Sequence, residues 1–435
     1  MPERYTETLE WLYHLEVSRG WDLKLESVRE ALSLLGSPEK DLRVLHVAGT
    51  NGKGSTAAIA QAVLTGAGLR VGLYTSPHLS DFRERIRIGN ELIPSDAVVD
   101  LVDEVRGRIR GSGVELTFFE FATAVAFLHF ARRGVDAAVV EVGLGGRLDA
   151  TNVVVPRVAA VTTIDFDHER YLGSTLAEIA AEKAGILKPG VPAVIGRVGG
   201  EALAVLERAA AEKGSSLLRL GREFVAEPRG EVFEYRGRRS IPRLRCALAG
   251  RFQIDNAAVA LAALEEGGWL ERVDDELVRG AVASVEWPGR LETISSRPLV
   301  VLDGAHNPAG ADALAREIPV IAAGRPVHLV FGVLADKRWE PMVERLAPLV
   351  TEAIVVPVPE RRSEDPGRVG AAFAGRVRTR TAASGSEALD RLRADLAGRD
   401  EVIVVAGSLF LVGEVRAQAL GTPRDPRVPQ NFLRL

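Results

Sequence analysis

The stretch HVAGTNGKGSTAAIA, residues 46–60, joins an apolar segment to an alanine-rich one through three glycines and a lysine. Glycine lets the backbone approach a ligand closely and turn its N–H groups inward. A helix that begins there adds unpaired N–H groups and the positive end of its dipole, which favours an anion. The stretch therefore predicts a phosphate-binding loop, with Lys53 on the outer phosphates and Ser55 or Thr56 facing Mg²⁺.

The spacing of this loop differs from the usual G-x-x-x-x-G-K-[ST], because Gly54 separates the lysine from the serine. A glycine-rich turn with an exposed lysine is the alternative interpretation. The residues predicted to contact the nucleotide here are Gly49, Thr50, Asn51, Gly52, Lys53, Gly54, Ser55 and Thr56.

A length of 435 residues predicts more than one domain. The net charge of −4, with acids and bases interspersed, argues against broad nucleic-acid or membrane binding but leaves room for a local basic pocket. The single cysteine, Cys246, excludes an intrachain disulfide and fits a reducing, cytoplasmic setting. Residues 1–16 read as a charged amphipathic helix rather than a signal peptide, and no segment approaches ~18 uninterrupted apolar residues.

Short β-branched runs alternate with helical patterns, which indicates βαβ units around a mainly parallel sheet. Helices are predicted over 119–134 and 174–190; the second begins at a capping box formed by Thr175 and Glu178 and ends before Pro189. The predicted strands are 43–48, 70–75, 136–142, 157–164 and 192–196.

Residues 213–250 alternate polar and apolar side chains between Gly and Pro, so short antiparallel strands are expected there, followed by a helix over 253–266. The α/β pattern restarts near residue 290, where we place a domain boundary. The predicted fold is α/β: a P-loop ATPase-type domain over 1–290 with a small antiparallel section, and a Rossmann-like domain over 291–435. Strands of the latter are expected within 298–308, 326–333, 351–358 and 400–408.

Polar residues follow the predicted strands of the first domain. Ligands of open α/β sheets bind outside the carboxyl ends of the strands. The first strand ends at the phosphate loop, the second runs into Ser76, the third carries Glu141 and the fourth runs into His168. A hydroxyl, a carboxylate and an imidazole beside bound phosphate are plausible ligands of Mg²⁺.

Each of these residues has a simpler structural interpretation. Ser76 before a proline could only shape a turn. Glu141 in an apolar strand could form a buried ion pair. His168 could cap a helix or bond a carbonyl. Lys183, in AAEKAG, would from periodicity alone be a solvated helix residue.

The ordered motifs of the chain resemble a known family. They are GTNGKGS (49–55), YTSPHLSDFRERIRI (74–88), EVGLGGRLDATN (141–152), IDFDHERYLG (164–173), EKAGILKPG (182–190), FQIDNA (252–257), WPGRLE (287–292), LDGAHNP (302–308) and GSLFLVGEVR (407–416). The chain is similar over nearly its whole length to folylpolyglutamate synthases and dihydrofolate synthases, of the Mur ligase group of ATP-dependent amide-forming enzymes. SPHL and LGGRLDATN favour this folate branch over the cell-wall ligases.

The resemblance implies a metal and phosphate site. Lys53 would bind the β- and γ-phosphates of ATP. Ser76 and Glu141 would hold one Mg²⁺, and Glu141 and His168 would contribute to a second. Lys183 matches a position that family members carry as a carbamylated lysine, which reverses the interpretation from periodicity; carbamylation needs a neutral amine, so burial would help.

The resemblance also assigns residues nearer the second domain. Gln253 and Asn256 look like a nucleotide-facing pair, and Arg290 resembles the arginine at the domain junction near the phosphates. Asp303 and His306 would be the contribution of the second domain to the closed site, positioning glutamate or assisting proton removal. A turn after a strand is the simpler interpretation of these last two.

The activity implied is ligation of L-glutamate to a pterin-bearing carboxylate through an acyl phosphate, with release of ADP and phosphate. Dihydropteroate and a reduced folate both fit as acceptors, so we expect a bifunctional enzyme that acts as a monomer. The pterin is expected against residues 80–87 and 118–123, although a plain helix core explains the phenylalanines equally well.

Three rival functions remain at this point. The protein could be a folylpolyglutamate synthase only, a cell-wall amino-acid ligase, or a regulatory protein that hydrolyses ATP slowly. The cell-wall ligase is disfavoured by LGGRLDATN and by the phosphate loop lying so early in the chain, and UDP-linked precursors would test it. The regulatory protein would need Lys53 and Ser55 but has no use for Glu141, His168 and Lys183 together.

Overall fold

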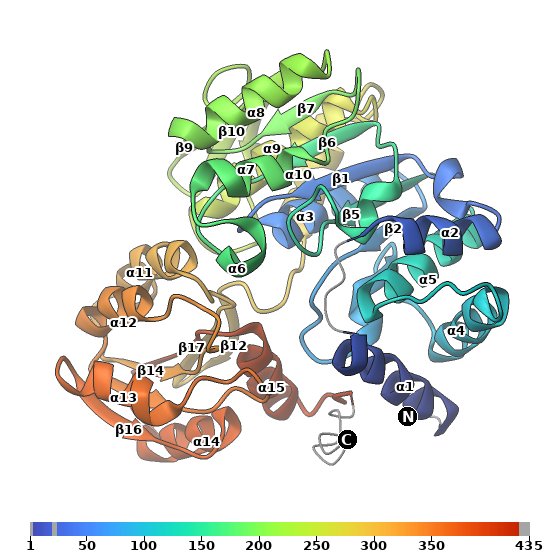
Figure 1. Ribbon diagram of the computed structural model, residues 1–435. Coiled ribbons are helices and arrows are strands. Elements are labelled where there is room, and N and C mark those ends of the chain that lie inside the picture. Colours follow the sequence, from blue (N-terminus) through green and yellow to red (C-terminus); the bar gives the residue numbers. More distant parts are fainter. Residues whose placement is uncertain (1–2, 20–23, 426–435) are drawn as a thin grey trace.

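The computed structural model describes residues 3–19 and 24–425, which form two α/β domains (Figure 1). The first domain is built on an eight-stranded sheet of order β4-β3-β2-β5-β1-β6-β7-β8. Its strands are β1 (Val44–Ala48), β2 (Val71–Tyr74), β3 (Ile86–Ile88), β4 (Glu91–Leu92), β5 (Ala137–Glu141), β6 (Val158–Val161), β7 (Ala193–Ile195) and β8 (Leu217–Arg219).

The pairs among β2, β5, β1, β6, β7 and β8 are parallel, and β3 and β4 extend one edge antiparallel. β1 and β5 are buried along their whole length because helices cover both faces. One face carries α3 (Lys53–Gly66), α9 (Phe252–Glu266) and α10 (Asp275–Ser284). The other carries α1 (Glu3–Arg19), α2 (Glu26–Leu34), α4 (Ser95–Ile109), α5 (Phe118–Arg133), α7 (Leu176–Ala184) and α8 (Gly200–Glu212).

A small antiparallel sheet of order β11-β10-β9 packs against the face of α9. Its strands are β9 (Val225–Arg229), β10 (Val232–Arg236) and β11 (Ser240–Leu244), as predicted for this region. β8, in the same region, is instead parallel to β7. It follows α8 as the last strand of a βαβ unit, so the expectation of antiparallel pairing is wrong for this strand.

The predicted helix over 174–190 is shorter in the structure. α7 begins at its capping box but ends at Ala184. Gly185 follows, and a side chain there would collide with the backbone of Arg147. Ile186 and Leu187 then turn into the core, which is why the chain leaves the helix axis early.

The second domain has a six-stranded sheet of order β12-β13-β17-β14-β15-β16, and only β12 is antiparallel to its neighbour. Its strands are β12 (Glu292–Ser296), β13 (Leu299–Leu302), β14 (Val327–Phe331), β15 (Glu352–Val355), β16 (Arg378–Thr381) and β17 (Val402–Ala406). Helices α11 (Pro308–Ala322), α12 (Glu340–Leu346) and α13 (Pro366–Ala374) cover one face, and α14 (Gly385–Asp395) and α15 (Leu409–Leu420) the other.

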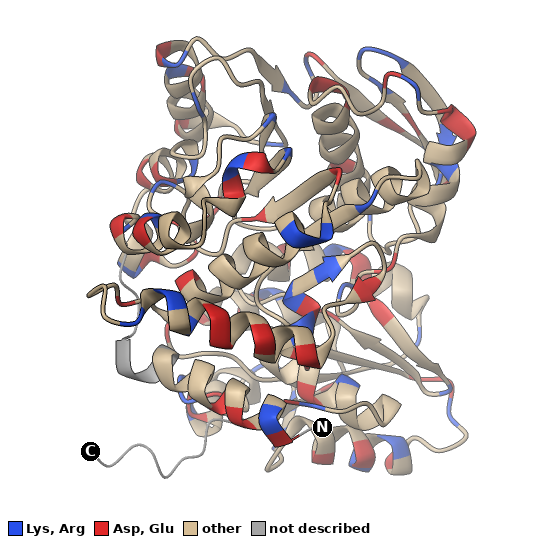
Figure 2. Ribbon diagram, turned by 90° about the vertical axis from the view of Figure 1, so that its right-hand side faces the viewer, with Lys and Arg blue, Asp and Glu red and all other residues tan. Residues whose placement is uncertain are grey.

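Basic and acidic residues are interspersed along the helices on the side shown in Figure 2, where the ribbon is coloured by residue charge. In the described parts of the chain, none of the helices combines the length and the apolar character needed to span a membrane.

Candidate active site

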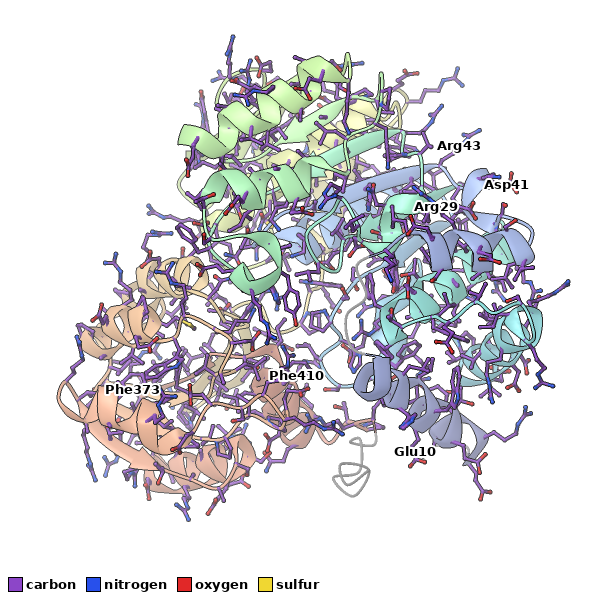
Figure 3. All side chains as sticks on the ribbon, in the orientation of Figure 1. Glu10, Arg29, Asp41, Arg43, Phe373 and Phe410 are labelled. Atoms are coloured by element: carbon purple, nitrogen blue, oxygen red, sulfur yellow. The ribbon has the colours of Figure 1, made fainter. Side chains whose placement is uncertain are left out.

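The carboxyl ends of both sheets open into one cavity of 1960 Å³ between the domains. Phe410, at the start of α15, lines it where the second domain faces the first (Figure 3). The predicted site residues that line this cavity are Gly49, Thr50, Asn51, Gly52, Lys53, Gly54, Ser55, Ser76, Glu141, His168, Lys183, Asn256, Arg290, Asp303 and His306. Two predicted residues, Thr56 and Gln253, do not line it.

The phosphate loop connects β1 to α3, as predicted. Gly49 has φ +145°, and a side chain there would collide with the Thr162 hydroxyl. That hydroxyl donates to the Asn51 carbonyl at 2.6 Å, and the Thr50 N–H donates to the Thr163 carbonyl at 2.8 Å. Thr162 and Thr163, directly after β6, thus hold the loop from behind and leave the N-terminus of α3 open to an anion.

Thr56 and Gln253 lie behind the cavity wall and contact Asn256. Both side chains are fully buried. The Asn256 amide donates to Gln253 Oε1 at 2.8 Å, and the Asn256 carbonyl accepts from the Thr56 hydroxyl at 3.5 Å. Of the pair predicted to face the nucleotide, Asn256 is on the wall and Gln253 orients it. A metal-facing role for Thr56 is not compatible with this position, whereas Ser55 lines the cavity.

Glu141 ends β5 and is 5% exposed. Its carboxylate accepts from the Ser76 N–H at 3.2 Å, which brings the ends of β5 and β2 together. Burial raises the pKa of Glu141, while Lys53 and the Ser76 N–H lower it. Within residues 3–19 and 24–425 no ion pair of Glu141 is formed, so the simpler interpretation as half of a buried ion pair is wrong.

The residues predicted to hold Mg²⁺ fit a phosphate-bound ion rather than a protein cage. In the described chain, no three or more His, Cys, Asp and Glu side chains gather closely enough to hold a metal. The predicted set instead offers a single carboxylate, Glu141, with the hydroxyls of Ser55 and Ser76 and the imidazole of His168. Magnesium is commonly held by one or two carboxylates, waters and substrate phosphates, which this set allows.

His168 precedes the short helix α6 (Glu169–Leu172) in the left-handed conformation, with φ +51°. Burial lowers its pKa to about 3, so the imidazole is neutral. Its Nε2 accepts from the ammonium of Lys337, a residue of the second domain, at 3.2 Å. His168 therefore lies where the two domains meet.

Lys183 is buried, with 4% of the residue exposed. Its ammonium donates to the Gly49 carbonyl at 3.0 Å, which places it directly behind the phosphate loop. Burial is the main cause that lowers the pKa of Lys183 to about 7, and the nearby Lys53 adds to it. A solvated position, as periodicity alone predicts, is wrong.

Asp303 and His306 follow β13 in the second domain. The Asp303 carboxylate accepts from the Leu291 N–H at 3.0 Å and the Ala305 N–H at 2.9 Å. Leu291 has φ +47°, so Asp303 fixes a strained junction between the domains. Arg290, beside it, donates to the Gly289 carbonyl at 3.0 Å.

A contact between the domains joins Asn51 and His306 to three residues that sequence reasoning did not assign, Asp167, Asn307 and Lys337. Asn51 and Asn307 exchange two amide hydrogen bonds of 3.1 and 3.0 Å. Asn307 also donates to Asp167 at 3.0 Å, and Lys337 pairs with Asp167 at 2.6 Å. The Nε2 of His306 lies 3.3 Å from the same carboxylate.

Asp167 is the centre of this contact. Burial alone would raise its pKa, but His306 and Lys337 hold it well below the usual value, so the carboxylate stays ionised. The motif LDGAHNP contains Asn307 next to His306, and IDFDH contains Asp167, so both could have been suspected. Lys337, in the polar segment ADKRWE, carries no local signal that distinguishes it from an exposed loop lysine.

The sheets of the two domains open into one cavity. The phosphate loop of the first domain lies on one side of this cavity, and the second domain contacts it from the other. This arrangement is that of an ATP-dependent ligase of two-domain type. Comparisons with known proteins make this specific. Residues 47–264 match the Mur ligase middle domain, and residues 289–409 match the Mur ligase glutamate ligase domain. The chain belongs to the Mur ligase family, in its branch of folylpolyglutamate and dihydrofolate synthases.

Relatives match over nearly the full length. The chain is 37% identical to the folylpolyglutamate synthase of Lacticaseibacillus casei, over 96% of this chain and 99% of that protein. It is 34% identical to the dihydrofolate synthase/folylpolyglutamate synthase of Bacillus subtilis, over 95% and 98%.

Solved structures agree with the fold. The Mycobacterium tuberculosis folylpolyglutamate synthase complexed with ADP superimposes with a TM-score of 0.89 at 34% identity, covering 98% of this chain and 100% of the other. Escherichia coli FolC in complex with DHPP and ADP gives 0.88 at 33% identity, covering 96% and 98%. The predicted fold class, family and ligase activity are confirmed.

Proposed function

We propose that this ligase is bifunctional and joins L-glutamate both to dihydropteroate and to the γ-carboxylate of a reduced folate. The observation that carries the proposal is the single cavity between the domains, which has a phosphate side and an aromatic side. On the aromatic side it is lined by Phe118 and Phe119; Tyr13 stacks on Phe118, with ring centroids 5.6 Å apart. A flat pterin fits such a wall.

The chemistry begins at a carboxylate, which is a poor acyl donor because oxide would have to leave. An oxygen of the acceptor carboxylate attacks the γ-phosphorus of ATP, the bond to the β-phosphate oxygen breaks, and ADP leaves. The glutamate amine then attacks the carbonyl carbon, phosphate leaves, and the amine loses a proton. Lys53 and Arg290 offset the negative charge during the first step.

Magnesium, when bound, supplies further neutralisation of the phosphate charge. The side chains that would hold it are Glu141, Ser55, Ser76 and His168, all on the cavity wall. Thr56 is not included because it lies behind the wall. Gln253 would not contact the nucleotide itself. It would orient Asn256, which would face the nucleotide.

Lys183 would act as its carbamate. The ammonium first loses one proton. The neutral amine then attacks the carbon of CO₂ and loses a second proton, so a cation is converted into an anionic carbamate. A buried lysine with a pKa of about 7 is partly neutral at physiological pH, and this supports the modification. The carbamate would lie beside the phosphate loop, where an anion can bind a metal ion.

Asp303 and His306 would act at the incoming glutamate in different ways. Asp303 would hold the Arg290–Leu291 junction by accepting from the Leu291 N–H. His306 faces the cavity beside Asp167 and is the better placed of the two to orient the amino acid. Closure of the second domain excludes water, which would otherwise hydrolyse the acyl phosphate.

The test is an incubation of purified protein with Mg·ATP and L-glutamate, with dihydropteroate in one tube, tetrahydrofolate in another and a UDP-linked cell-wall precursor in a third. Phosphate release and product mass are measured together. A mass gain of one glutamate in the first two tubes supports bifunctionality, and a gain in only one assigns a single activity. Ligation of the UDP-linked precursor instead refutes the proposal. The Lys53→Ala variant is the matched inactive control.

A further inference from the structure

The described chain continues beyond α15 and returns to the first domain. This tail, residues 421–425, runs from α15 toward α1 (Figure 1). The backbone N–H of Asp425 donates to the Ser80 carbonyl at 2.9 Å. Its carboxylate Oδ2 accepts from the Phe82 N–H at 2.5 Å and from the Tyr13 hydroxyl at 2.9 Å. The last described residue is thus anchored by one backbone and two side-chain hydrogen bonds.

Hydrogen bonds continue from this carboxylate into the cavity. The Tyr13 oxygen lies 3.4 Å from Nε2 of His78, and Arg85 Nε donates to Nδ1 of His78 at 2.8 Å. Because Nδ1 accepts, Nε2 carries the proton of a neutral ring and donates to Tyr13. Burial and Arg85 keep the pKa of His78 well below its usual value, consistent with a neutral ring.

The far end of this series of bonds faces the aromatic wall. The guanidinium of Arg85 lies 5.1 Å from the centroid of the Phe118 ring. Tyr13, His78, Arg85, Phe118 and Asp425 all line the cavity. The tail therefore contacts, through three side chains, the surface on which a pterin would stack.

Helix α15 contacts residues 78–82, the loop that also binds Asp425, from another side. The Ser80 hydroxyl donates to the Gly413 carbonyl at 3.1 Å. A side chain at position 413 would collide with the Leu79 carbonyl, so helix and loop meet backbone to backbone. Residues 78–82 consequently lie between the second domain and the helices of the first.

We propose that Asp425 is a positioning residue for the pterin-bearing substrate. By accepting from Phe82 and Tyr13 it holds His78 and Arg85 against Phe118, so the tail of the second domain completes the wall of the acceptor half of the cavity. Asp425 touches no reacting atom and acts through these side chains. The inference rests on the proposed binding of the pterin against residues 80–87 and 118–123.

Steady-state kinetics of the full-length protein test this inference with Asp425→Ala, Tyr13→Phe and the double variant. Loss of the charge-assisted bonds should raise KM for dihydropteroate by about tenfold. KM for ATP should stay within about twofold, because the phosphate loop is held by other contacts. The double variant should raise KM by less than the product of the two single effects, since both remove the same bond. Asp400→Ala, an exposed acid paired with Arg325 in the same domain, is the control.

Melting temperatures of the same variants separate positioning from general damage. An unchanged KM for dihydropteroate in Asp425→Ala overturns the inference, as does a parallel rise of KM for ATP, glutamate and dihydropteroate with a lower melting temperature. Wild-type protein that ligates neither dihydropteroate nor tetrahydrofolate contradicts the proposed function, and the inference fails with it. An active wild type with unaffected variants contradicts the inference alone.

Discussion

At the scale of single residues, the site depends on polar groups held in places that disfavour their charge. Lys183 is the clearest case, because it is buried behind the phosphate loop, and burial disfavours its ammonium more than the nearby carboxylates of Asp167, Asp149 and Glu182 favour it. Glu141 is buried in the same way at the end of β5. Such perturbed groups gather at functional sites.

Replacing Lys183 by alanine should lower the ligation rate by about 100-fold or more, because the proposed carbamate, an anion that would support the proposed metal site, could not form. The fold should remain, since removal of a buried ammonium does not destabilise the core by charge. Small carboxylic acids such as acetate should restore part of the activity by occupying the vacated space. The rate is measured by phosphate release with product mass.

Lys188→Ala is the control for this variant, because Lys188 belongs to the same segment and donates to the Asn152 carbonyl away from the cavity. Near-normal activity of Lys183→Ala would remove Lys183 from the mechanism.

His46, in the middle of β1, predicts a pH dependence of stability. Burial, with a contribution from Lys188, lowers its pKa to about 3. Between the unfolded value of ~6.5 and this folded value, the unfolded chain binds a proton that the folded chain does not, so stability falls as pH falls. From pH 7 to pH 5 the loss amounts to about 2 kcal/mol.

Urea unfolding at pH 7 and pH 5 checks this prediction in wild type and His46→Gln. The variant should lose about 2 kcal/mol less than wild type between the two pH values. Using the difference between pH values removes any general cost of the substitution. Equal losses in both proteins would show that His46 does not cause the dependence.

Individual side chains were predictable where a motif and a strand end coincide. The phosphate loop, Ser76, Glu141 and His168 all follow strands, and all line the cavity. Thr56 and Gln253 could not be excluded, because one helical position decides whether a side chain faces the cavity or the core. Lys337 and Asp425 find their partners in the other domain. The sequence around each of them carries no information about that contact, so neither could be predicted.

At the scale of elements, α7 presents Lys183 to the phosphate loop, and a capping box fixes its start. The Thr175 hydroxyl accepts from the Glu178 N–H at 3.2 Å, and the Glu178 carboxylate accepts from the Thr175 N–H at 3.0 Å. The helix has only nine residues, so its first turn is a large share of it.

Thr175→Ala should lower the free energy of unfolding by about 1 kcal/mol, because an N–H at the start of the helix loses its acceptor. Hydrogen exchange of the α7 amides should become faster. Ser174→Ala, one residue earlier, is the control and should change neither quantity. Unchanged exchange in Thr175→Ala would mean that packing alone holds α7.

Buried parallel strands were predictable because their apolar runs are continuous, as in β1, β5, β14 and β17. Edge strands were not. β12 and β16 carry polar, partly exposed residues that resemble a loop, and only pairing with a neighbour makes them strands. The pairing of β8 likewise depends on the crossover that precedes it.

At the scale of the whole molecule, the contact between the domains rests on the two amide hydrogen bonds between Asn51 and Asn307 and on the ionised Asp167. The phosphate loop thereby contacts the second domain directly. Because Lys337 and His306 hold the pKa of Asp167 low, this carboxylate remains charged throughout the neutral range, and the contact persists there.

Asn307→Asp should lower the ligation rate by at least about tenfold, because a second carboxylate would face Asp167. The new side chain still accepts from the Gly310 N–H that Asn307 caps, so α11 should remain intact. Small-angle scattering with a non-hydrolysable nucleotide should show a larger radius of gyration. Adding Asp167→Asn removes the repulsion and should restore part of the rate. An unchanged rate and an unchanged radius of gyration in Asn307→Asp would show that this contact does not hold the domains together.

If the second domain moves during turnover, the meeting of Gly413 with the Leu79 carbonyl limits how closely α15 can approach residues 78–82. Side chains can change rotamer and let two surfaces drift, but two backbones in van der Waals contact cannot approach further. Any such movement would therefore end at the same separation of the two domains, however the surrounding side chains are arranged. Acyl transfer needs reacting atoms about 3 Å apart, and a rigid end point of this kind reproduces that separation.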